Sequence, residues 1–340
     1  MRSSLLLLVI IFLISCTNHP IPLTQTQIPE ADDWYTLYFT HPGEAGTGLA
    51  VESALVDSIG SANDSIDLAI YSFSLPTVAD ALIAARDRGV EIRMVMEADN
   101  MESSQVKRLL AAGIPIQPDS SDGLMHDKFV LIDKHEVWAG SMNLTITSVQ
   151  EDANNLIRIE LQELVADYAV EFDAMYERQL FGQSHIPQTP YPLFTVGSTT
   201  LEAFFPPNDS AARRLTELIV SSDESIVFMA SNFTSDPLSA ALIAAGGRGV
   251  NVSGLMDADN AISDTGSDYQ LLTDAGIRVM LDKDPGRMHH KVLIIDNAIV
   301  AFGSYNFTGS AEKYNDENLL IIHDPGLAAR FLAEYQRLID

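Results

Sequence analysis

The sequence of 340 residues contains a single cysteine and is poor in positive charge, with 20 lysines and arginines against 47 aspartates and glutamates. One thiol excludes a disulfide bond within the chain. The formal charge of −27 at pH 7 repels polyanions and argues against a broad nucleic-acid groove, whose affinity would come from lysine and arginine. No stretch alternates basic with aromatic residues, as single-strand binders require. An acidic surface also suits any secreted protein in a salty medium, so the charge alone leaves the substrate open.

The apolar run near the N-terminus, residues 5–14, is too short to cross a bilayer as a mature helix. It follows Arg2 and has the form of a secretory signal. Residues 13–16 resemble a bacterial lipobox, in which the cysteine is acylated, and Cys16 stands at that position. We therefore expect a signal peptide over 1–15, then lipidated Cys16 and a tether over 16–33. This predicts an exported lipoprotein of the bacterial cell envelope, at the outer membrane or cell surface.

One motif occurs twice in the chain: H-x-K-x-x-x-x-D, followed by G-S-x-N. Each residue of the second copy stands 163 positions after its counterpart. The similarity continues outside the motif, because ALIAARDRGV from Ala81 matches ALIAAGGRGV from Ala241. We interpret the chain as a duplicated domain, with a first copy over 34–181, a linker over 182–197 and a second copy over 198–340. The motif residues are His126, Lys128, Asp133, Gly140, Ser141 and Asn143, then His289, Lys291, Asp296, Gly303, Ser304 and Asn306.

Strand and helix patterns alternate in each copy, which indicates an α/β fold. Ser74 and Pro76 favour a helix start, and Gly89 favours its end. The elements expected in the first copy are strands over 66–73, 90–96, 126–132 and 136–139, and helices over 74–89, 103–113 and 161–180.

Side chains alternate along a strand, so His126 and Lys128 share one face, as do His289 and Lys291. After the next strand, Gly140 permits a close approach of the backbone. The two lysines, two asparagines and two serines of the motifs can then surround a phosphate and supply charge and hydrogen bonds to its nonbridging oxygens. The simplest interpretation is one active site built from both copies.

On these motifs the chain resembles the phospholipase D superfamily, and its second motif looks most like the branch of bacterial nucleases and mitochondrial cardiolipin hydrolases. The resemblance covers residues 34–340. It implies two tandem domains, each a mixed β-sheet flanked by helices, related by a pseudo-twofold axis with the active site between them. It also implies metal-free cleavage of phosphodiesters through a phosphohistidine, with no cofactor. Relatives with one motif per chain dimerise, so a chain with both motifs is expected to act as a monomer.

The copies differ 28 positions after the motif histidine, where Asn154 in the first copy stands against Glu317 in the second. In the superfamily a carboxylate at this spacing often accepts the Nδ1 proton of the motif histidine. We therefore expect Glu317 to orient His289, and Asn154 to orient His126. A carboxylate stabilises an imidazolium, whereas an amide fixes the tautomer without charge. This predicts that His126 is the nucleophile and that His289 is the acid that protonates the leaving oxygen.

Other residues near the motifs have structural explanations. Asp133 and Asp296 are expected to cap turn amides at strand ends. His290 points to the strand face opposite His289 and is expected to pack in the interior. Four residues at the end of the first strand of each copy fit either the substrate entrance or the core: Tyr71, Phe73, Asn232 and Phe233.

Three functions fit the sequence. The membrane tether and the acidic surface favour a phospholipase D-type phosphodiesterase acting on phospholipids. The look of the second motif favours the alternative, an exported endonuclease. A noncatalytic membrane-anchored binding module is the third, opposed by the presence of every motif residue. A metal site at His126 and His289 is the competing chemistry, but Lys128 and Lys291 would repel a cation, and no H-x-x-x-H or cysteine spacing is present.

Overall fold

The computed structural model describes residues 34–184 and 189–340. The expected signal peptide, the lipidated Cys16 and most of the tether lie outside these residues. No helix in the described ranges has both the length and the apolar character needed to cross a membrane.

The first half contains a seven-stranded mixed sheet with the order β1-β7-β6-β5-β2-β3-β4. Strand β2 runs parallel to β3 and antiparallel to β5, as in the mixed sheet that the family resemblance implies. The strands are β1 (Tyr35–Thr40), β2 (Ser65–Ile70), β3 (Glu91–Met96), β4 (Ile116–Pro118), β5 (Lys128–Ile132), β6 (Glu136–Gly140) and β7 (Asn154–Ile159).

The second half repeats this sheet in the order β13-β12-β10-β14-β15-β17-β9 and adds β8 at the edge. Strand β8 pairs with β9 although it lies within the range 182–197 expected as a linker, so the second sheet begins before residue 198. A separate pair joins β11 (Phe233–Thr234) to β16 (Phe307–Thr308). The sheet strands are β8 (Leu193–Val196), β9 (Thr199–Phe204), β10 (Ser225–Ala230), β12 (Asn251–Met256), β13 (Arg278–Leu281), β14 (Lys291–Ile295), β15 (Ile299–Gly303) and β17 (Leu319–His323).

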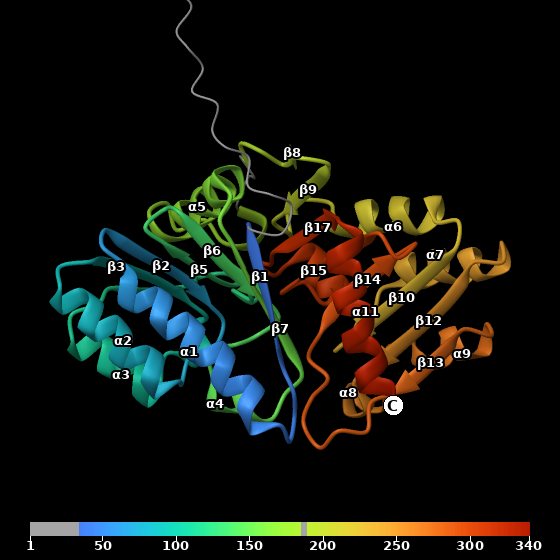
Figure 1. The fold of residues 1–340 in the computed structure, drawn as a ribbon, viewed down its shortest axis with the longest axis horizontal. Coiled ribbons are helices and arrows are strands. Elements are labelled where there is room, and N and C mark those ends of the chain that lie inside the picture. The colour runs from blue at the N-terminus through green and yellow to red at the C-terminus, as the bar shows by residue number, and fades with distance from the viewer. Residues whose placement is uncertain (1–33, 185–188) are drawn as a thin grey trace, which may run out of the picture.

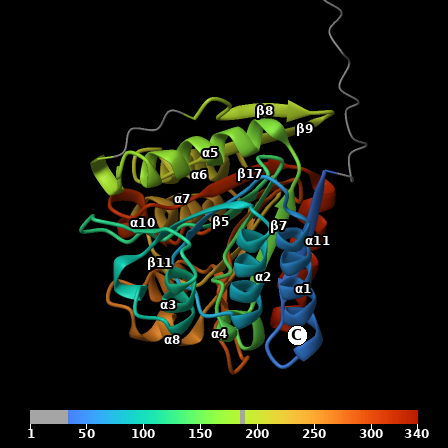
Figure 2. The same ribbon diagram turned by 90° about the vertical axis from the view of Figure 1, so that its left-hand side faces the viewer.

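Helices cover the sheets of both halves, and Figure 1 shows the first half on the left and the second on the right. Three short helices from both halves, α3, α4 and α8, lie at the same end of the molecule (Figures 1 and 2). The helices are α1 (Ala45–Ser61), α2 (Pro76–Asp87), α3 (Ser104–Ala111), α4 (Ile146–Gln150), α5 (Gln162–Tyr176), α6 (Ala211–Ser221), α7 (Asp236–Gly247), α8 (Ala258–Ser263), α9 (Tyr269–Asp274), α10 (Gly309–Lys313) and α11 (Pro325–Ile339), with single 3₁₀ turns at Ala98–Asn100 and Gly182–Ser184.

One hydrophobic core is shared by the two halves and holds them together. It contains Tyr168 and Phe172 from α5, and Leu327 and Phe331 from α11, all without exposed surface. Two further cores lie inside the individual halves. Since full burial of such a side chain contributes about 1.5–3 kcal/mol, the shared core makes the two halves a single packed unit.

Candidate active site

The two motifs meet at the junction of the halves. Backbone bridges join Met125 to Asp316 and Ala153 to Met288, and these two bridges are related by the same shift of 163 residues as the motifs. The bridges lie next to the motif histidines, so both copies of the motif contribute to one site within a single chain.

Hydrogen bonds fix this junction on both sides. The N–H of His126 donates to the carbonyl of Asp316, and the N–H of His289 donates to the carbonyl of Ala153, each over 2.9 Å. The chains approach so closely that a Cβ on Gly286 would lie 1.5 Å from the carbonyl oxygen of Glu151. The equivalent Gly123 would place a Cβ 2.0 Å from the carbonyl oxygen of Tyr314, so both positions require glycine.

The orienting groups are the two residues expected from the sequence, but the expected pairing is wrong. His126 donates from Nδ1 to Glu317 over 2.8 Å, and His289 donates from Nδ1 to Oδ1 of Asn154, also over 2.8 Å. Each motif histidine is thus oriented by the other half. The backbone bridges are the physical reason, because the bridge at Asp316 sets Glu317 beside His126 and the bridge at Ala153 sets Asn154 beside His289.

Burial determines the charge of the first histidine. Burial raises the pKa of Glu317 to about 7, and burial together with Lys128 and Lys291 lowers the pKa of His126 well below its usual value. At an exposed position, the short contact with Glu317 would favour a charged imidazolium. Here the cost of desolvating that charge is larger, so His126 is neutral. His126 therefore keeps its proton on Nδ1 and a free lone pair on Nε2.

The second histidine lacks a charged partner. Burial, followed by Lys291 and Lys128, lowers the pKa of His289 well below its usual value, and the amide of Asn154 adds no negative charge to oppose this. An imidazolium at His289 is therefore a strong acid that gives up its proton readily once a nearby anion has allowed it to form.

The two motif lysines are buried side chains that supply positive charge. Lys128 donates from Nζ to the carbonyl of His126 over 2.7 Å, and Lys291 donates to the carbonyl of His289 over 2.8 Å. Burial lowers the pKa of Lys128 to about 8, although Glu317 opposes the shift. Burial and the neighbouring Lys128 lower the pKa of Lys291 well below its usual value. The site thus concentrates cations that a phosphate anion would stabilise.

The remaining motif residues divide into two groups. Asn143 and Asn306, each 15 residues after a motif lysine, are half-buried and stay candidates for phosphate contacts. Ser141 and Ser304 do not surround the phosphate as expected, because both are fully buried and turned to the orienting groups. Ser304 donates to Glu317 over 2.6 Å, and Ser141 donates to Oδ1 of Asn154 over 3.1 Å.

The motif aspartates cap turns, as the sequence predicts. Asp133 accepts the backbone N–H groups of Asn63, Asp64 and Ser65 at 2.7–2.9 Å. Asp296 accepts three equivalent N–H groups, from residues 223–225. Burial acts to raise the pKa of each aspartate, but these three donors outweigh it and lower the pKa. Both residues stabilise the start of the first inner strand of their sheet rather than the chemistry.

Of the four residues that could line the entrance, Tyr71 contacts the site. Its ring centroid lies 4.9 Å from that of His126 in an edge-on arrangement, and Nζ of Lys128 lies 5.1 Å from the same ring. The counterpart of Tyr71 in the second half is Ser231. Phe73 and Phe233 instead belong to the cores of their halves.

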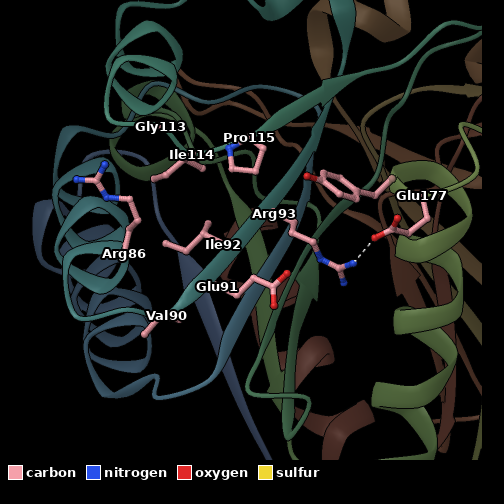
Figure 3. Close-up of a pocket in the computed structure, with 10 residues that line it drawn as sticks. Arg86, Val90, Glu91, Ile92, Arg93, Gly113, Ile114, Pro115 and Glu177 are labelled. Carbon is pink, nitrogen blue, oxygen red and sulfur yellow. Dashed lines mark hydrogen bonds and ion pairs between the residues drawn. The ribbon is translucent and has the colours of Figure 1, made fainter.

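One pocket of the first half lies away from the motif residues. Figure 3 shows a pocket beside β3 lined by Arg93, Glu177 and Gly113, with no motif residue. Arg93 is held there by Asp67 over 2.7 Å and by Glu177 over 2.9 Å, so its charge is already neutralised. Among the residues that the structure describes, no group of three or more histidine, cysteine or acidic side chains could hold a metal ion.

Comparison with known families identifies the family and the fold. The family model described as "Cardiolipin synthase, PLD-like domain" matches residues 55–176 and again 215–339. These two matches cover more than half of the chain, so the protein belongs to this phospholipase D-like family. It carries two copies of the domain.

Two relatives each match less than half of the chain. The chain is 34% identical over 166 residues to a "Phospholipase D" of Rickettsia bellii, covering 47% of this chain and 82% of that protein. It is 33% identical over 133 residues to the human "Mitochondrial cardiolipin hydrolase", covering 38% of this chain and 53% of that protein. The chain thus spans about half the length of this second relative.

A solved structure shows the same fold over both halves. A phosphatidylserine synthase of Haemophilus influenzae aligns with a TM-score of 0.67 at 11% identity, covering 89% of this chain and 86% of that chain. Nuc of Salmonella typhimurium, a phospholipase D family member, is 33% identical and covers 42% of this chain and 94% of its own, with a TM-score of 0.40. The first alignment extends over both halves and supports the two-domain architecture.

The lowered pKa of Lys128 predicts an alkaline limit on substrate capture. As pH rises through about 8, Lys128 in the free protein loses its proton and the site loses a charge that neutralises phosphate. The value of kcat/KM should therefore fall over this range, since kcat/KM reports the free enzyme. In Lys128→Arg, whose side chain stays charged, the fall should move to higher pH.

Lys107→Arg, at an exposed position on α3, is the matched control and should leave the profile unchanged. The affinity for sulfate, an anion that does not titrate in this range, should weaken over the same interval. A constant sulfate affinity from pH 7 to 9 would contradict the assigned pKa.

Proposed function

We propose that this protein is a metal-independent phosphodiesterase of the phospholipase D type, which hydrolyses phospholipids through a phosphohistidine at His126. The observation that carries the proposal is the crossed pair of oriented histidines, with two buried lysines beside them, in a single chain. We also propose that the chain acts as a monomer anchored to the bacterial envelope through Cys16.

The first step is attack by His126. Its Nε2 lone pair forms a bond to phosphorus while the bond from phosphorus to the leaving oxygen breaks, and Nε2–H of His289 supplies the proton to that oxygen. The anionic substrate itself raises the tendency of His289 to hold this proton. Lys128 and Lys291, with Asn143 and Asn306, stabilise the charge on the nonbridging oxygens.

The second step releases the phosphoryl group to water. His289, now neutral, takes a proton from water as the oxygen attacks phosphorus, and the bond to Nε2 of His126 breaks. Glu317 stabilises the positive charge that His126 carries while it is phosphorylated. With the crossed pairing, His126 is still the proposed nucleophile and His289 the proposed acid. The carboxylate of Glu317 stabilises the phosphorylated His126, and the uncharged amide of Asn154 leaves protonated His289 a strong acid.

Two features support a phospholipid as substrate. Relatives that match one half of the chain are named a phospholipase D and a cardiolipin hydrolase. In addition, Leu124 and Tyr314 are 37% and 53% exposed and lie beside each other at the junction, two residues from His126 and three from Glu317. Their counterparts in the other half-site are the charged residues Arg287 and Glu151. An apolar side near the nucleophile suits a diacylglycerol unit, and a charged side near the acid suits a headgroup.

The direct test uses the full chain in detergent, treated with EDTA. It is assayed on mixed micelles of phospholipids with several headgroups and on single- and double-stranded DNA. We expect release of a headgroup that EDTA leaves intact and that His126→Ala abolishes. His323→Ala, at the far end of β17, is the matched control and should stay active.

Each other outcome has a meaning. Cleavage of DNA with intact lipids would contradict the lipid substrate and support the endonuclease. Binding to lipid without cleavage of any phosphodiester would support the noncatalytic module. Loss of headgroup release with EDTA would contradict metal-free chemistry.

The apolar pair at the junction yields a separate prediction. In Leu124→Ser and Tyr314→Ser, kcat/KM on long-chain phospholipid micelles should fall about tenfold each, because loss of roughly 1.4 kcal/mol of apolar contact corresponds to that factor. Cleavage of soluble bis(p-nitrophenyl) phosphate should change little. Leu271→Ser on α9, a leucine that is 49% exposed at the outer edge of the second half, should affect neither substrate. Equal losses on both substrates would show that the pair does not contact lipid.

A further inference from the structure

A fully buried polar residue follows each catalytic histidine. These residues are Asp127 and His290, and neither has exposed surface. Packing alone was expected for His290, but the structure shows that both residues accept hydrogen bonds from the opposite half. Asn318 donates from Nδ2 to Asp127 over 2.7 Å, and Asn155 donates from Nδ2 to Nδ1 of His290 over 2.9 Å.

In the first half-site, these contacts close a ring around the nucleophile. Asn318 is the neighbour of Glu317, and its N–H donates to Oγ of Ser304 over 2.9 Å. Ser304 donates in turn to Glu317, the partner of His126. The dipeptide of His126 and Asp127 is therefore held at both residues by the dipeptide of Glu317 and Asn318.

The second half-site contains the same ring. The N–H of Asn155 donates to Oγ of Ser141 over 3.1 Å, and Ser141 donates to Asn154, the partner of His289. His289 and His290 are thus held by Asn154 and Asn155. All members of the ring other than His289 are fully or nearly fully buried. Each ring crosses the junction twice, and hydrogen bonds between buried groups are electrostatically strong, so they hold side-chain orientation. One oxygen in each ring, Oδ2 of Asp127 and Oδ1 of Asn155, is buried without a hydrogen-bond partner.

The outer end of the second ring sets the tautomer of His290. Its Nε2 lies 3.4 Å from Glu334, which also accepts hydrogen bonds from Arg337 and from His41. These donors outweigh burial and lower the pKa of Glu334, so it is ionised and can only accept. The proton of neutral His290 therefore lies on Nε2, and Nδ1 is free to accept from Asn155.

The first ring ends differently. The counterpart of Glu334 is Glu171, whose charge acts on Asp127. Burial and Glu171 raise the pKa of Asp127 well above its usual value. The two rings therefore have equivalent geometry and different chemistry at their ends.

We propose that His290 and Asp127 are positioning residues, each of which holds the orienting group of one catalytic histidine. His290 acts through Asn155, Ser141 and Asn154 on His289. Asp127 acts through Asn318, Ser304 and Glu317 on His126. The kinetic form of this proposal rests on the proposed function, in which the two histidines act in different steps.

The leaving group separates the two rings. With bis(p-nitrophenyl) phosphate, the leaving p-nitrophenolate is a weak base and departs without a proton, so formation of the phosphohistidine needs His126 but not the acid His289. Hydrolysis of that intermediate needs His289 as the base. A rapid burst of p-nitrophenol thus reports on the first ring, and the steady rate that follows reports on the second.

The test compares two variants of each residue in the full chain. His290→Phe keeps an aromatic side chain of similar shape and loses the hydrogen-bond acceptor. It should lower the steady rate about 10- to 100-fold and leave the burst rate within about twofold of the original. Groups that orient a histidine ligand in metal sites have effects of this size. His290→Gln, which can accept from Asn155 and donate to Glu334, should restore most of the rate. Asp127→Leu should slow the burst itself, and Asp127→Asn should restore it.

A merely structural role would lower the burst amplitude and the steady rate in proportion, because fewer molecules would be folded. That result would overturn the proposal. So would unchanged kinetics in both His290→Phe and Asp127→Leu. His323→Phe, which removes another histidine paired with a glutamate, is the matched control and should change neither phase.

A second readout does not depend on activity. Selective ¹⁵N labelling of histidine should show His289 as the Nδ1–H tautomer in the original chain and a mixture of tautomers in His290→Phe. An unchanged tautomer would overturn the positioning role. If the original chain released no p-nitrophenol and the tautomer still changed, the proposed function would fail and the positioning role would stand.

Discussion

The crossed hydrogen bonds between each motif histidine and the opposite half are the interaction on which this active site depends. Neither half holds its own orienting group: Glu317 serves His126, and Asn154 serves His289. The backbone bridges beside these pairs fix the position of one half against the other, and the neighbouring glycines allow the close approach of the two backbones. Because the shared core keeps the halves from separating, the chain provides in one molecule what two half-sites must otherwise assemble.

Duplication within one chain also allows the half-sites to differ. A carboxylate stands against an amide as orienting group, and Tyr71 stands against Ser231 beside the lysines. Exposed Leu124 lies near His126, where the other half carries Arg287 near His289. These differences favour one direction for the substrate, since nucleophilic attack and acid catalysis require different surroundings.

The sequence predicted the repeat, the α/β class and the meeting of the two motifs at one place, because these depend on spacing and on the alternation of side chains along strands. The pairing of Glu317 was wrong because contacts between the halves leave no periodic signal within either half. Helix α1 was not predicted, and its N-cap, Glu44, makes no side-chain capping bond that would mark the start. The long helix expected to Leu180 ends at Tyr176, and Gln179 adopts a positive φ of 53° that is incompatible with a continuing helix.

The most direct measurement is the position of the covalent intermediate. The full chain would be mixed with bis(p-nitrophenyl) phosphate, quenched within the first turnover at alkaline pH, where phosphohistidine survives, and mapped by peptide mass spectrometry. We predict a p-nitrophenyl phosphoryl adduct on His126 and none on His289. An adduct on His289 alone would contradict it, because the nucleophile would then be the histidine without the carboxylate.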